Sequence, residues 1–241
     1  MHHYTGPGTA VESNEYLRRR ADGGARALAV VVDVPTRQGY DSDSREAAGR
    51  VGRAGVAIDS VDDMRVLFRG IRLGAVSVTL TAADPAGALL LLCQLVGEEQ
   101  GVPARRMRGV LGTGGAGGPR VFPASAAPRP GADVLAYLRA ELPGWTVRAV
   151  AAPPPDAACL PCPVLESRQR ERLAKLRAWR DQDLVGEALL RVHKAAWGTD
   201  GVLPPMKDAL RSGATVGEVY GTLREVWGGG AGPQGPPHRM S

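Results

Sequence analysis

The strongest constraint on the fold is an alternation of apolar, β-branched runs with amphipathic stretches along the first 151 residues. The apolar runs predict buried strands, and the amphipathic stretches predict helices. Five strands are expected at 26–34, 55–58, 76–81, 108–111 and 145–151, and helices at 12–22, 61–70, 85–100 and 132–142. Strands that alternate with helices form right-handed crossover units and a parallel sheet. The expected fold class is α/β, with a parallel sheet of about five strands in an open or barrel-like arrangement.

The pattern changes after residue 164, where charged amphipathic helices follow one another without a strand signal. These helices are expected at 165–180, 184–197, 206–212 and 216–227. Clusters of proline and glycine punctuate the chain and mark its boundaries. We expect four parts: a partial β/α barrel at 1–152, a Pro-rich linker at 153–163, a helical region at 164–228 and a disordered tail at 229–241.

Composition excludes several classes of protein. With 241 residues, 44% hydrophobic and 23% charged, the chain can bury one core and is not disordered throughout. Its longest apolar run, at 86–96, is shorter than a membrane span, and the N-terminus lacks a signal-peptide pattern. A net charge of +5 scattered along the chain does not predict nucleic-acid binding. A soluble cytoplasmic protein is the expectation.

Residues 112–117 satisfy the pattern G-x-G-x-x-G directly after a predicted strand, where a dinucleotide fingerprint would stand. That fingerprint requires a helix whose N-terminus faces the pyrophosphate. Here Gly118 and Pro119 follow, and they cannot start a helix at the right place. We therefore expect a flexible loop.

Cys159 and Cys162 have the C-x-x-C spacing of a redox pair or of half a zinc site. Cys93 lies in an apolar helix, where it is expected in the core. The four histidines show no metal-ligand spacing with the pair; they are His2, His3, His193 and His238. An incidental pair and a functional thiol pair both stay open, and no metal site is predicted.

Polar side chains follow the predicted strands at their carboxyl ends, where parallel α/β proteins bind ligands. Their hydroxyls can hold a phosphate or a thioester carbonyl, or they can cap helices and satisfy loop backbone. The residues are Asp33, Thr36, Asp59, Ser60, Thr79, Thr81 and Thr113.

Several long segments resemble the large, substrate-binding barrel of the methylmalonyl-CoA mutase family. Residues 4–14, YTGPGTAVESN, are similar to the family's Y-A-G-F-x-T-A-x-E-S-N. Residues 33–43, DVPTRQGYDSD, resemble its D-L-P-T-x-x-G-Y-D-S-D. Residues 55–60, 98–102 and 143–145 follow in the family's order, and 168–227 resemble the helical end of the same subunit.

The resemblance implies a partial barrel and a substrate site. Tyr4 matches the tyrosine that lies over the substrate and the cobalamin face. The hydroxyl-bearing strand that contacts the thioester is matched by Ser77, Thr79 and Thr81. We expect Tyr4, Asp33, Tyr40 and Asp41 as catalytic residues, because their segments are polar and not needed for packing alone. Ser77, Thr79, Thr81 and Thr113 are expected to bind substrate.

The sequence also departs from the family pattern. Ala29 occupies a position where the family usually has a serine. Gly112 and Thr113 replace a Gln-Asn pair of the family, and Thr146 replaces an asparagine. The substrate-binding arginine has no counterpart, and the polarising histidine belongs to an internal stretch that is missing here. No D-x-H-x-x-G segment is present. The family uses adenosylcobalamin, but no cofactor is predicted for this chain.

The resemblance leaves three hypotheses open. The first is a repurposed, cobalamin-independent enzyme acting on an acyl thioester or acyl-derived intermediate in a biosynthetic pathway. The second is a non-catalytic partner of a mutase or cobalamin-binding subunit, and the third is an inactive remnant. Five strands cannot close a barrel that needs about eight, so the sheet edges must be covered by the C-terminal helices or by a second copy. A homodimer is therefore expected.

Overall fold

The structure is a computed structural model, and it describes residues 8–81, 86–114, 128–150 and 162–228. Several sequence predictions fall outside these residues: the catalytic role of Tyr4, the pairing of Cys159, and the disordered tail. Of the flexible loop expected at 112–117, residues 112–114 continue a strand instead, and 115–117 lie outside the described residues. Most of the Pro-rich linker also lies outside them. Of the described cysteines, Cys93 is buried and Cys162 is exposed, and both are free thiols.

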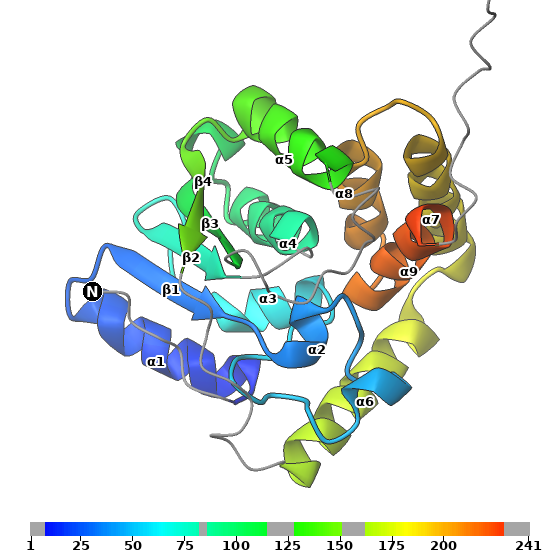
Figure 1. Cartoon of the computed structure of the whole chain (residues 1–241). Coiled ribbons are helices and arrows are strands. Elements are labelled where there is room, and N and C mark those ends of the chain that lie inside the picture. Colours follow the sequence, from blue (N-terminus) through cyan, green and yellow to red (C-terminus); the bar gives the residue numbers. More distant parts are fainter. Residues whose placement is uncertain (1–7, 82–85, 115–127, 151–161, 229–241) are drawn as a thin grey trace, which may run out of the picture.

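A parallel sheet of four strands forms the centre of the molecule (Figure 1). The strands lie in chain order and are β1 (Ala27–Val31), β2 (Ser77–Thr81), β3 (Arg108–Gly114) and β4 (Trp145–Val150). Their register places Ala29 beside Thr79, Thr79 beside Val110, and Val110 beside Thr146. The predicted α/β class with a parallel, partial barrel-like sheet is confirmed.

The expected strand at 55–58 is only an isolated pair of bridges. Val56 pairs with Val32 on one side and with Gly8 on the other. Two residues later the amide of Ile58 donates to Oγ1 of Thr36, at 3.2 Å, instead of to a strand. The side chain of Thr36 therefore binds the backbone amide that would have continued the strand pairing. Among the described residues the sheet has four strands, where about five were expected.

Helices of the first part follow the predicted pattern, with differences at α2, at the end of α3, which stops at Leu67 and not at residue 70, and at the start of α5. They are α1 (Ala10–Asp22), α2 (Val34–Arg37), α3 (Val61–Leu67), α4 (Ala86–Glu99) and α5 (Pro128–Glu141), with 3-10 turns η1 (Arg45–Ala47) and η2 (Ala104–Arg106). The short α2 stands partly in a segment expected to be a loop, because Asp33 caps it and Pro35 suits its first turn. Proline also suits the first turn of α5, which starts at Pro128, four residues before its predicted start.

The helix α4 is the centre of the core. Its sequence is apolar on all sides, and every residue from Ala86 to Gly97 is buried. A helix of this kind needs neighbours all round. It packs on β2 and β3 on one side and on α8 on the other, as Figure 1 shows.

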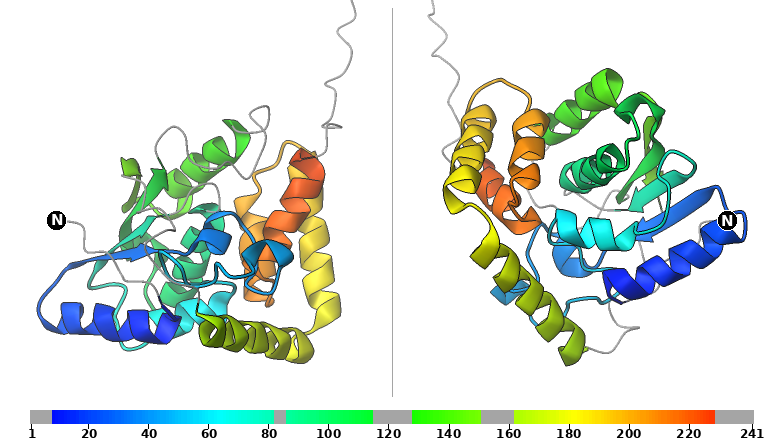
Figure 2. Two further views of the ribbon diagram at one scale, coloured as in Figure 1. Left: turned by 60° about the horizontal axis from the view of Figure 1, so that its bottom comes forward. Right: turned by 180° about the vertical axis from the view of Figure 1, so that it is seen from behind.

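The C-terminal helices were predicted closely. They are α6 (Pro163–Trp179), α7 (Gln182–Trp197), α8 (Leu203–Arg211) and α9 (Val216–Trp227). Figure 2 shows α7, α8 and α9 grouped on the side of α4 away from the sheet. Val192 of α7 and Tyr220 of α9 belong to the same hydrophobic cluster as Leu28 and Leu80 of the sheet. The helical region thus shares one core with the β/α part. No described helix combines the length and apolar character required to cross a membrane.

The two faces of the sheet differ in chemistry. Successive side chains of a strand point to opposite faces. Leu28, Val30, Val78, Leu80 and Leu111 are buried on the face that α4 covers. The other face carries shorter and more polar side chains, and its members are partly or largely exposed in several places. This second face positions the candidate site.

Candidate functional site

A row of hydroxyl groups lies along β2 on the face opposite α4. Ser77 and Thr79 are half-buried, and Thr81 is buried with 8% exposure. Their alternation with the buried Val78 and Leu80 explains why all three share one face. The structure therefore brings together three of the residues expected to bind substrate.

Partly or largely exposed side chains flank this hydroxyl row. Ala29 of β1 and Val110 of β3 flank Thr79 in register and are half-buried. Arg108, in register with Ser77, is exposed, and so is Thr146 of β4. Hydroxyl and guanidinium groups on one partly open surface can bind a carbonyl oxygen and an anionic group together.

Thr113, the fourth residue expected to bind substrate, is placed only by its backbone. It belongs to β3 and pairs with Ala149 of β4. Gly112, not Thr113, is the residue of β3 that lies beside Thr81. The side chain of Thr113 lies outside the described part of the structure.

Asp33 is fully buried at the end of β1 and acts as a helix cap. Its carboxylate accepts hydrogen bonds from the amides of Thr36, at 3.0 Å, and Gly52, at 2.7 Å. Burial raises the pKa of the Asp33 carboxyl to about 6, although these hydrogen bonds act in the opposite direction. The contacts give Asp33 a structural role, and its catalytic role stays a prediction.

Asp41 joins the loop after β1 to two C-terminal helices. Its Oδ2 accepts from Oγ1 of Thr215 at 2.6 Å and from Arg177 at 2.8 Å, and its Oδ1 accepts from the amide of Gly217 at 2.6 Å. The residue is only 6% exposed. Burial raises the pKa of Asp41 to about 6 against these favourable contacts. Its oxygens are occupied by protein donors, so its catalytic role also stays untested.

Tyr40 is the neighbour of Asp41 in the sequence, but its ring contacts a different arginine, Arg224. It is half-buried, and the guanidinium carbon of Arg224 lies 4.4 Å from the centre of its ring. This is the distance of a cation–π interaction. Arg224 also donates to the carbonyl of Gly39 at 3.0 Å. The ring thus helps to fasten α9 to the same loop.

A second pair of buried carboxylates lies at the start of α3. Gln169 of α6 donates one amide group to Asp59 and to Asp63, each at 2.9 Å. Arg172 pairs with Asp63 at 3.0 Å. Burial, followed by repulsion from Asp63, raises the pKa of Asp59 well above its usual range. Burial likewise raises the pKa of Asp63. This pair therefore anchors α6 to the start of α3.

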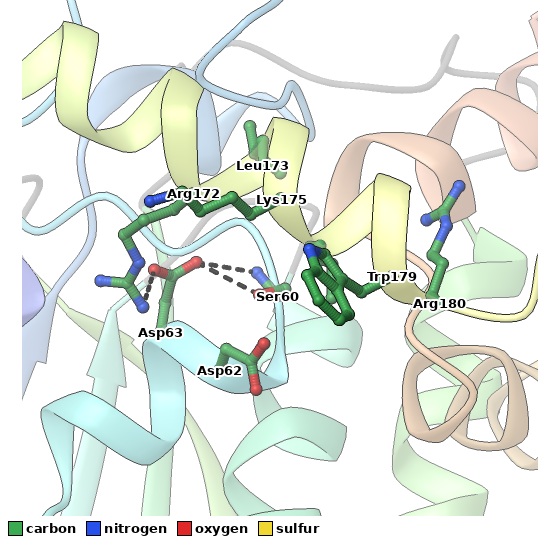
Figure 3. A pocket seen from close by; sticks show the side chains of 9 residues that line it. Ser60, Asp62, Asp63, Arg172, Leu173, Lys175, Trp179 and Arg180 are labelled. Carbon is green, nitrogen blue, oxygen red and sulfur yellow. Dashed lines mark hydrogen bonds and ion pairs between the residues drawn. The ribbon is translucent and has the colours of Figure 1, made fainter.

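A cavity of about 470 Å³ opens between α3 and α6. Figure 3 shows Asp63 directed toward Arg172 and Ser60, with Trp179 and Arg180 further along α6. Its lining residues are Ser60, Asp62, Asp63, Arg172, Leu173, Lys175, Leu176, Trp179 and Arg180. Most of its charges are already paired: Asp62 with Arg65, Asp63 with Arg172, and Arg180 with Glu218. These ion pairs connect the elements around the cavity, and none of its lining residues belongs to β2.

The carboxylates that follow the first two predicted strands are enclosed by backbone donors. They belong to segments that resemble those of the cobalamin-using family, and the cofactor of this chain stays a prediction. Asp33, after β1, and Asp59, before α3, are fully buried and accept hydrogen bonds from the amides of Gly52 and Ser42, respectively. In the described ranges, no three acidic, histidine or cysteine side chains are grouped so that they could hold a metal ion.

Sequence reasoning missed the partners of the buried carboxylates. Gln169, Arg172 and Arg177 of α6 look like ordinary residues of a charged helix. Thr215 and Glu218 carry a usable signal, since T-x-x-E before an apolar run is a capping box, and the structure contains it. That signal predicts where α9 begins, but it does not reveal that Thr215 also binds Asp41.

Together, the parallel strands and the helices between them define a partial β/α barrel, and a row of hydroxyl groups lies on one face of its sheet. The comparisons agree: a family model described as methylmalonyl-CoA mutase matches residues 1–153 and 151–229. The chain belongs to the methylmalonyl-CoA mutase family.

Individual relatives match over shorter ranges. The chain is 40% identical over 147 residues to a methylmalonyl-CoA mutase large subunit of Propionibacterium freudenreichii subsp. shermanii, covering 59% of the chain and 20% of that protein. It is 45% identical over 108 residues to a large subunit of Streptomyces virginiae and 44% identical over 108 residues to a mutase of Escherichia coli. Each of these two matches covers 45% of the chain and 15% of the relative. The chain thus spans a fifth or less of the length of these relatives.

Proposed function

We propose that this protein binds an acyl thioester on the hydroxyl row of β2 and acts on it without cobalamin. It would be a cytoplasmic, repurposed member of the family in a biosynthetic pathway, using an acyl-CoA or an acyl-derived intermediate. The observation that carries this proposal is the position of Ser77 and Thr79, half-buried on the face that α4 does not cover.

Local chemistry supports an acyl thioester as the ligand. Hydroxyl groups donate hydrogen bonds to a carbonyl oxygen, and such bonds are strongest when the group is partly removed from water. The small side chain of Ala29 lies beside Thr79 in register, and we expect the acyl part to bind there. The exposed guanidinium of Arg108, beside Ser77, suits an anionic part such as a phosphate. The relatives are named after methylmalonyl-CoA, a thioester that has both an acyl part and phosphate groups.

Independence from cobalamin is supported by the residues around the same row. Ala29 and Thr146 occupy positions where the family resemblance implies a serine and an asparagine. A radical reaction needs a sealed, water-free cavity, whereas Arg108 and Thr146 on this face are exposed.

A screen of the purified protein tests the proposal. A panel of acyl-CoA thioesters is incubated with the protein, with and without adenosylcobalamin, and bound and converted species are identified by mass spectrometry. We expect one thioester to be retained and converted equally in both arms. Conversion that depends on adenosylcobalamin, or no retained thioester at all, would overturn it.

A second candidate is a non-catalytic partner of a mutase or cobalamin-binding subunit. The observation that favours it is the structural use of Asp33 and Asp41, two of the expected catalytic residues, whose oxygens accept hydrogen bonds from protein groups. Co-expression with a mutase subunit, followed by affinity purification, distinguishes the candidates. Stable co-purification without thioester conversion would favour the partner role.

A further inference from the structure

The outer face of α7 carries a regular stripe of exposed residues. The stripe consists of Asp183, Glu187, Leu190, Lys194 and Trp197. Their spacing alternates between four and three residues, which keeps them on one side of a helix. Leu190 is 70% exposed and Trp197 is 51% exposed. Figure 2 shows in both views that α7 lies at the rim of the molecule. The buried side chains of α7 do not belong to the stripe; they are Val185, Ala188, Val192, Ala195 and Ala196.

The charges of this stripe have opposite signs on the two sides of Leu190. The acidic Asp183 and Glu187 lie toward the start of α7, and the basic Lys194 lies toward its end, where Arg191 is also exposed. Within the described residues, none of these four side chains forms an ion pair or hydrogen bond, so their charges are available to a partner.

We propose that α7 pairs two copies of this chain, antiparallel, about a twofold axis that passes near Leu190. In this arrangement Leu190 meets Leu190 of the partner subunit, and Glu187 faces Lys194 of the partner subunit. The same contact is repeated by symmetry, because a twofold interface uses one patch twice. Trp197 comes to lie near Asp183 of the partner subunit and covers the end of the interface.

The charge pattern specifies a second copy over an unrelated partner. A helix that is acidic in one half and basic in the other is complementary to itself only when it is reversed. The parallel orientation would place Glu187 against Glu187 of the partner subunit, which repels. An apolar centre flanked by opposite charges is the usual composition of a specific helix pair. The predicted homodimer thereby acquires a definite interface, separate from the edges of the sheet.

Charge exchange provides the test. Molar mass is measured by size-exclusion chromatography with light scattering over a range of micromolar concentrations. The wild type should have the mass of two chains. Glu187→Lys and Lys194→Glu should each weaken the dimer about tenfold or more, since each creates two like-charge contacts. An equimolar mixture of the two variants, and the double variant E187K/K194E, should both recover the mass of two chains.

Two further variants distinguish loss of the interface from loss of folding. Leu190→Asp should give a folded monomer by circular dichroism. Val164→Asp, at a 61% exposed position of α6, is the matched control and should leave the dimer intact. A monomeric wild type, a dimer that survives Leu190→Asp, or a mixture that fails to recover would overturn the proposal.

Discussion

The amide of Gly217 in α9 donates to Asp41 in the loop after β1 at 2.6 Å, joining residues 176 positions apart in the sequence. A Cβ atom at position 217 would lie 2.5 Å from Cγ of Asp41, so only glycine permits this approach. The carboxylate is thereby a structural fastener between the β/α part and the C-terminal helices. Its motif neighbours, Tyr40 and Asp43, are also held by arginines of these helices.

Gly217→Ala should destabilise the protein by about 1–3 kcal/mol, because the added methyl group overpacks a buried contact. Gly221→Ala is the matched control in the same helix. A Cβ there meets nothing within 4 Å, and alanine favours a helix, so stability should rise by up to about 1 kcal/mol. Urea unfolding measures both changes. Equal behaviour of the two variants would refute the close contact with Asp41.

Asp41→Ala should cost about 2–4 kcal/mol in unfolding free energy, because it leaves Arg177 and the amide of Gly217 without their acceptor. Asp43→Ala removes another partner of Arg177 from a position with a 31% exposed side chain. Its cost should be below about 1 kcal/mol. Should Asp43→Ala prove the more damaging variant in urea titrations, the assignment of Asp41 as the fastener is wrong.

Arg180→Lys should destabilise the joint between α6 and α9 by about 1–2 kcal/mol. Arg180 pairs with both oxygens of Glu218, each at 2.6 Å, and also donates to the carbonyl of Gly213. Lysine cannot reproduce this forked geometry. Arg211→Lys, at a 53% exposed side chain, should be nearly neutral. Thermal unfolding compares them, and equal shifts in Tm for the two variants would argue against the role of Arg180.

Stability should fall as pH rises from about 4 to about 6 and then level off. Burial raises the folded-state pKa of Asp33 and of Asp41 to about 6, above the ordinary value of 3.8. Over this window the unfolded chain loses these protons while the folded chain retains them, so ionisation favours unfolding. Each group contributes a slope of up to about 1.4 kcal/mol per pH unit.

Two carboxylates act in the opposite direction, but at lower pH. Against the effect of burial, the hydrogen bond from Lys207 lowers the pKa of Glu98, and that from Arg180 lowers the pKa of Glu218. Their stabilisation is lost only as pH falls below their ordinary value of 4.5. Urea titrations between pH 4.5 and pH 6 therefore isolate the raised groups. A stability that increases with pH over this interval would contradict their assignment.

Much of the fold could be predicted because local patterns determine it. The run Leu28–Val32 and the capping box at Ser60 are short-range signals, and β1 and α3 follow them closely. The expected strand at 55–58 was wrong because the side chain of Thr36, 22 residues away, binds the backbone of Ile58. Such a contact has no local signature.

The candidate site was predictable to the same extent. The alternation of Ser77, Thr79 and Thr81 with apolar residues indicates one shared face, and the structure places them so. The environment of Asp41 could not be predicted, because its partners Arg177 and Thr215 lie more than 130 residues away. A polar motif that resembles a family's catalytic segment can equally consist of structural contacts, and only the fold distinguishes them.

The most direct test of the proposed function is the affinity of Thr79→Val for the thioester that the screen identifies. Valine keeps the shape of threonine but removes the hydroxyl, so isothermal titration calorimetry should show binding about tenfold weaker at unchanged Tm. Thr222→Val is the control, since the hydroxyl of Thr222 donates to the carbonyl of Glu218 within α9 and should not affect binding. Unchanged affinity in Thr79→Val would contradict the assignment of the site to the hydroxyl row of β2.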